Sequence, residues 1–141
     1  MKNNQEKGMN IPDDLKYHEK HQWLKMIDDI TMICGITDYF QNSMGEINLV
    51  EFINNILNSE IETGEKIVIV ESTKSSTDIK AIASGRIIDI NRDLEESPEL
   101  INNDPYGDGW IYKIEIDDTN ILNDILEPDE YLDIIFTEDI F

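Results

Sequence analysis

The segment of this chain that says most about its fold is Ile67-Val68-Ile69-Val70-Glu71-Ser72-Thr73-Lys74-Ser75-Ser76-Thr77-Asp78-Ile79. The β-branched residues at its start predict a stiff strand. A run of small hydroxyl residues follows, which favours a turn, and Ile79 begins a second predicted strand over residues 79–83. The single lysine of that run, Lys74, would therefore stand in solvent at the tip of a hairpin. Spacing alone favours an ordinary solvated lysine, and the alternative is an amine presented to a modifying enzyme.

Further short strands are predicted on both sides of this hairpin. They cover residues 21–27, 30–36, 46–52, 86–90 and 110–116. The first two are joined at Asp28-Asp29, which is a hairpin signal. A two-residue period places four side chains of the last strand on one face: Trp110, Tyr112, Ile114 and Ile116. Many short strands between turns favour a sandwich or barrel over alternating strand–helix units.

Three short helical segments are also predicted. Thr37 or Asp38 can cap a helix that Gly45 ends in a left-handed conformation. Ser97 can cap a helical turn with Pro98 at its first position. Pro128 can open a C-terminal helix that covers the sheet. Its hydrophobic residues share one face: Tyr131, Leu132, Ile135 and Phe136.

The length of 141 residues suits one folded domain, predicted over residues 14–141 after a loose tail at residues 1–13. The formal net charge of −20 argues against binding to nucleic acid or to anionic membranes. It is explained by a solvated acidic surface, or by attraction to basic surfaces on partners. The polar N-terminus has no signal-peptide core, so we expect a cytoplasmic protein. Cys34 lies among hydrophobic residues and is predicted to be buried.

Other candidate sites are weak. His18 and His21 are the only histidines, and a metal centre needs more ligands, so we predict a structural or surface role for both and no metal. Adjacent acids such as Glu95-Glu96 are expected by chance in a chain with 31 acidic residues. No histidine lies near Ser75 or Ser76 in the sequence to activate a nucleophile. We therefore expect that this chain is not an enzyme.

The hairpin segment, residues 71–78, resembles the lipoylation site of the glycine cleavage system H protein family. Other motifs of that family follow in order and with nearly the family spacing. They are Tyr17 with His21-Gln22-Trp23-Leu24, Gly35-Ile36-Thr37-Asp38, Met44-Gly45-Glu46-Ile47, Ala81-Ile82-Ala83-Ser84-Gly85, Ser97-Pro98-Glu99-Leu100-Ile101-Asn102 and Asp104-Pro105-Tyr106-Gly107-Asp108-Gly109-Trp110. The resemblance extends from about Tyr17 to Phe136.

This resemblance implies a mostly β, lipoyl/biotinyl-type hybrid barrel-sandwich with a short internal helix and a C-terminal helix. Lys74 would carry a covalent lipoyl group, supported by the turn residues Glu71, Ser72, Thr73, Ser75 and Asp78. The group would shuttle an aminomethyl unit from glycine decarboxylase (P protein) to aminomethyltransferase (T protein). Dihydrolipoamide dehydrogenase (L protein) would reoxidise it. A lipoate ligase or a lipoyl/octanoyl transferase would attach the lipoate. The carrier supplies position and reach, and the cofactor and partner enzymes supply the chemistry.

Some residues depart from the family pattern, namely Thr73, Ile82 and the segment 53–56. They are compatible with an H-like protein for lipoate relay or regulatory modification. Biotin carriage is disfavoured because Thr73 and Ser75, rather than methionines, flank Lys74. An unmodified acidic protein-binding module is the alternative from another functional class.

Overall fold

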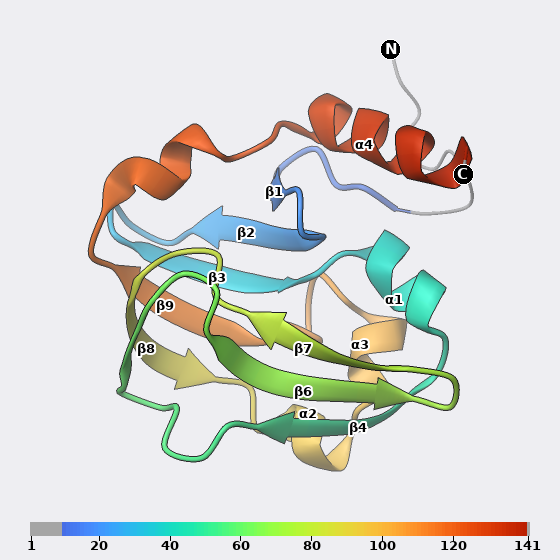
Figure 1. Cartoon of the computed structure of the whole chain (residues 1–141), viewed down its shortest axis with the longest axis horizontal. Coiled ribbons are helices and arrows are strands. Elements are labelled where there is room, and N and C mark those ends of the chain that lie inside the picture. The colour runs from blue at the N-terminus through green and yellow to red at the C-terminus, as the bar shows by residue number, and fades with distance from the viewer. Residues whose placement is uncertain (1–9, 141) are drawn as a thin grey trace.

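The computed structural model describes residues 10–140, and their side chains as far as Glu138. All strand pairs are antiparallel. They form a six-stranded sheet in the order β1-β2-β3-β9-β8-β5 and a three-stranded sheet in the order β4-β6-β7. Figure 1 shows the three-stranded sheet lying across the larger one. This two-sheet architecture confirms the predicted barrel-sandwich.

The strands are β1 (Lys16–His18), β2 (Gln22–Met26), β3 (Thr31–Ile36), β4 (Ile47–Phe52), β5 (Glu60–Ile61), β6 (Lys66–Ser72), β7 (Ser76–Lys80), β8 (Gly85–Ile90) and β9 (Tyr112–Ile116). The helices are α1 (Asp38–Met44), α2 (Asp93–Glu96), α3 (Leu100–Asn103), the 3₁₀ helix η2 (Thr119–Asn123) and α4 (Pro128–Ile140). Among the described residues no helix is both long and apolar enough to cross a membrane.

The main hydrophobic core combines buried residues of both sheets. Val50 and Val70 face each other across β4 and β6, and both are buried together with Leu24 and Ile114 of the larger sheet. Along β9 and the second half of β4, buried residues alternate with more exposed ones. In β2 both faces are covered, because Leu24 belongs to the main core and Trp23 to a second cluster. Burying a valine or leucine side chain contributes roughly 1.5–3 kcal/mol, so the main core is the main source of stability for the sandwich.

A second, smaller hydrophobic cluster lies between α4 and the β1–β2 hairpin. The Tyr17 and Tyr131 rings stack with centroids 4.9 Å apart, and Leu132 and Ile135 are buried beside them. Figure 1 shows α4 lying over β1. The predicted C-terminal helix and its role as a cover for the sheet are therefore confirmed.

The strand that follows the hairpin tip is displaced from its predicted position. It covers Ser76–Lys80, whereas the sequence predicted residues 79–83. The polar residues Ser76 and Thr77 join the ladder because β6 offers them backbone partners at Glu71 and Val70. Local strand propensity did not reveal this, because the partner strand supplies the bonds.

Two further predictions were wrong in part. A helical turn does follow Ser97, whose carbonyl accepts from the Leu100 N–H at 3.1 Å, but Ser97 is the C-cap of α2 and α3 begins only at Leu100. Trp110 lies outside β9 and packs against the smaller cluster instead of sharing a face with Tyr112. Its carbonyl accepts a hydrogen bond from the buried Asn91 side chain, at 2.8 Å, which holds the chain out of the strand at this point.

The N-terminal tail is shorter than predicted. Ile11 is fully buried, and the carbonyl of Pro12 accepts a 2.7 Å hydrogen bond from the Tyr17 hydroxyl. Residues 10–13 are thus part of the packed structure, because Ile11 is buried in the second cluster. The rest of the predicted tail, residues 1–9, lies outside the described residues.

Candidate functional site

The tip of the β6–β7 hairpin is a three-residue loop of Thr73, Lys74 and Ser75. Glu71 pairs with Ser76, and the Ser72 N–H donates to the Ser75 carbonyl at 2.8 Å. The Ser72 hydroxyl oxygen accepts from the N–H groups of Lys74, at 3.3 Å, and Ser75, at 3.1 Å. Serine at the first position of a turn stabilises it by such bonds. Lys74 therefore lies where the sequence predicted, at the tip of a braced hairpin.

The Lys74 side chain is exposed and runs past the end of α1. A β-carbon placed on Gly45 would lie 3.5 Å from Lys74 Cε, which is ordinary contact. In the described part of the chain, no ion pair involves the Lys74 ammonium group. Another molecule can therefore reach this nitrogen from solvent.

The surface beneath Lys74 is held by Gly45 and Asn102. Gly45 ends α1 with φ 83° and ψ −160°, a combination that essentially only glycine adopts. The Asn102 side chain donates to the Gly45 carbonyl at 2.9 Å and accepts from the Ile47 N–H at 2.8 Å. The end of α1 was predicted, but this clamp was not, because Asn102 is 57 residues from Gly45 in the sequence.

The remaining predicted site residues fall into two groups, one in the turn and one in the strands beside it. Thr73 and Ser75 are exposed in the turn itself. Glu71 and Asp78 belong to β6 and β7, and Asp78 pairs with Lys66 at 3.2 Å. The turn therefore contains fewer residues than the predicted segment, and the two acids are strand residues beside it.

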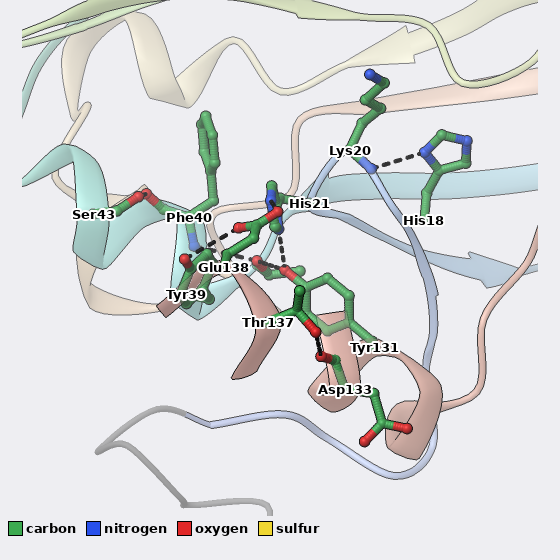
Figure 2. Close-up of polar contacts among 11 residues, drawn as sticks. His18, Lys20, His21, Tyr39, Phe40, Ser43, Tyr131, Asp133, Thr137 and Glu138 are labelled. Carbon is green, nitrogen blue, oxygen red and sulfur yellow. Dashed lines mark hydrogen bonds and ion pairs between the residues drawn. The ribbon is translucent and has the colours of Figure 1, made fainter. Parts of the chain in front are cut away.

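A groove of about 530 Å³ lies beside β7. Its walls come from the β1–β2 turn, α1, β7 and the end of α4, through residues that include His21, Phe40, Asp78 and Glu138. Figure 2 shows the polar contacts that join His21 of this wall to Tyr131 and Glu138 of α4. The His21 Nδ1 is 2.8 Å from the Tyr131 hydroxyl and its Nε2 is 3.1 Å from Glu138.

The predicted structural role of His21 is confirmed by these contacts. Its backbone has φ 67°, which makes the tight turn between β1 and β2, and its ring stacks on Phe40. The Tyr131 hydroxyl also lies 2.7 Å from Oγ1 of Thr37, the N-cap of α1. One buried phenol thus joins α4, the β1–β2 turn and α1.

The buried titratable groups remain neutral. Burial raises the pKa of the Cys34 thiol to about 12, so it is an inert core residue, as predicted. Burial also raises the pKa of Tyr131 and of Tyr17. No group of three or more histidine, cysteine or carboxylate side chains suited to a metal ion occurs between residues 10 and 138.

Comparisons with known proteins agree with one another. The family model described as Glycine cleavage H-protein matches residues 15–138. Glycine cleavage system H protein from Alkalilimnicola ehrlichii is 40% identical over 129 residues, which are 92% of this chain and 98% of the relative. The protein of the same name from Coxiella burnetii is 40% identical over 128 residues, which are 91% of this chain and 97% of the relative.

A solved structure agrees as well. The crystal structure of a glycine cleavage system H protein from Mycobacterium marinum superposes with a TM-score of 0.76 at 30% sequence identity. The match covers 87% of this chain and 97% of that one.

Proposed function

The chain belongs to the glycine cleavage H-protein family, and from this membership we propose that Lys74 is its lipoyl attachment site. Glycine cleavage H proteins carry lipoate covalently on a lysine, and this chain has the role of a lipoyl carrier in the glycine cleavage system. The observation that supports Lys74 is its exposed position in a hairpin tip with a braced backbone.

The residues around Lys74 fit a lysine-linked lipoyl group. The ammonium group is accessible, and the Ser72 hydroxyl fixes the backbone from which the arm would extend. When bound, the lipoyl disulfide supplies an acceptor for the aminomethyl group and for two electrons. The protein's own contribution is to hold one end of the arm, which makes each transfer local by raising the effective concentration.

We infer that the chemical steps belong to the P, T and L proteins, the partners that this family implies. The described side chains that bond to the hairpin tip and to Gly45 beneath it are hydroxyls and amides that hold the backbone. We further propose that a lipoate ligase or a lipoyl/octanoyl transferase loads Lys74. A cytoplasmic location stays a prediction.

Intact-mass measurement tests the attachment site. Incubation of the protein with lipoate, ATP and a purified lipoate–protein ligase should add one lipoyl mass. Lys74→Arg keeps the charge and should add none. Lys80→Arg removes another exposed lysine of the same hairpin and should be loaded like the wild type. No added mass on the wild type, or lipoyl on another lysine, would contradict the proposal.

A decarboxylation assay separates glycine cleavage from lipoate relay or regulation. The loaded wild type should support glycine decarboxylation by a P protein, and Lys74→Arg treated in the same way should not. A loaded carrier that never supports decarboxylation would favour the H-like alternative.

A further inference from the structure

The outer face of the three-stranded sheet carries hydrophobic side chains next to the hairpin that bears Lys74. Val50, Phe52, Val68 and Val70 point into the core, so the residues between them point outward. Among these, Leu49 is 41% exposed although it is apolar, and Ile69 is half-buried.

The register places these residues in a defined pattern. Leu49 pairs with Glu71, and Glu51 pairs with Ile69. The two apolar side chains are therefore diagonal neighbours on one face, and the two carboxylates occupy the other diagonal. Diagonal neighbours are roughly 7–8 Å apart, which long side chains can bridge. We call this surface, made of Leu49, Glu51, Ile69 and Glu71, the outer patch.

The charges of the outer patch are not neutralised within the described structure. No ion pair among residues 10–138 involves Glu51 or Glu71. Lys66, at the start of β6, pairs with Asp78 of β7 and not with either carboxylate of the patch. The surface that complements the patch therefore has a basic group set between apolar groups.

The patch is continuous with Lys74, because Glu71 precedes it by three residues at the end of β6. An enzyme that acylates Lys74 must bring its active site to Nζ, close to the hairpin backbone. Enzymes that act on the lipoyl disulfide would meet the far end of a flexible arm and would not have to contact the hairpin backbone. The position of the patch therefore favours the loading enzyme as the partner that binds it.

We propose that the outer patch is the docking surface for the enzyme that attaches lipoate to Lys74, an inference that rests on the proposed function. The occupant presents a basic side chain flanked by apolar ones. In the loading step, Nζ as a neutral amine attacks the carbonyl carbon of an activated lipoyl donor, an acyl adenylate for a ligase. The carbon–nitrogen bond forms, the carbon–oxygen bond to AMP breaks, AMP leaves and the nitrogen loses one proton.

Loading kinetics test the proposal with lipoate, ATP and purified lipoate–protein ligase. Leu49→Ser and Glu51→Lys should each raise the KM for the carrier by at least about fivefold with kcat unchanged, because they weaken docking and leave Nζ untouched. Added salt should raise the wild-type KM and should affect Glu51→Lys less, since screening acts on the charge that this variant lacks.

Matched controls lie elsewhere on the surface. Leu122→Ser changes a leucine of η2 that is 42% exposed, and Glu60→Lys reverses an exposed charge on β5. Both should be loaded like the wild type. After prolonged loading, Leu49→Ser and Glu51→Lys should support P-protein decarboxylation at the wild-type rate.

The possible results separate this proposal from the assignment of Lys74. Equal KM values for patch and control variants would overturn the docking surface and leave Lys74 as the attachment site. Slow decarboxylation by fully loaded patch variants would show that the outer patch also serves the P protein, which would overturn its assignment to the loading enzyme. Failure of the wild type to accept lipoate would overturn both proposals.

Discussion

Ser72 shows how one side chain can shape the presentation of another. Its hydroxyl oxygen accepts from two successive backbone N–H groups, those of Lys74 and Ser75. Ser72→Ala should leave these amides to solvent, so their hydrogen exchange should accelerate. Because the tip is exposed, water replaces the lost partner, and the stability cost should be at most about 1 kcal/mol. Loading of Lys74 should slow, since the tip becomes less ordered.

Ser76→Ala is the matched control for this change, because it removes an exposed hydroxyl at the start of β7. Amide exchange at Lys74 and Ser75 in that variant should equal the wild-type rate. Equal exchange rates in Ser72→Ala and the wild type would show that the hydroxyl does not order the tip.

The packing of helix α4 depends on the Tyr131 hydroxyl, which contacts two other parts of the fold. The Tyr131 hydroxyl lies 2.8 Å from His21 and 2.7 Å from the buried Thr37 hydroxyl, which caps α1. Tyr131→Phe keeps the stacking on Tyr17 but removes a hydrogen-bond partner from both His21 and the Thr37 hydroxyl. Leaving buried polar groups unsatisfied costs about 1–3 kcal/mol, so the urea midpoint should fall accordingly.

Thr137→Val provides the comparison within the same helix. It removes a hydroxyl whose only described bond is to the Asp133 carbonyl on the exposed side of α4. Its effect should stay within about 0.5 kcal/mol. Identical unfolding midpoints for Tyr131→Phe and Thr137→Val would show that the buried contact does not hold α4.

The molecule as a whole should lose stability in alkali through its buried tyrosines. Burial raises the pKa of Tyr17, Tyr106, Tyr112 and Tyr131 above the ordinary value of 10.0. The unfolded chain therefore releases these protons at lower pH than the folded chain does. Stability from this source is complete below about pH 10 and declines as pH rises towards the folded-state values. Tyrosinate absorbance from these four residues and the loss of far-UV circular dichroism should rise together above about pH 10. The chain has five tyrosines, so ionisation of more than one of them before any loss of ellipticity would contradict this.

Most of the local structure was predictable because its causes lie within a few residues. The alternation of β6, the hydroxyl-rich turn and the cap residues Thr37 and Gly45 each act over less than one turn or hairpin. The position of Lys74 follows from two of these signals, so the sequence could place it at the tip without knowledge of the fold. The family motifs then led to the proposal that Lys74 carries a lipoyl group.

Contacts between distant segments could not be predicted in this way. The start of β7 at Ser76, the burial of Ile11 and the rotation of Trp110 out of β9 all depend on which strand or helix lies opposite. The same holds for the outer patch, where a register between β4 and β6 brings Leu49 beside Ile69. Register is selected by burying one whole face of each strand, a property of the assembled sheets and not of any short segment.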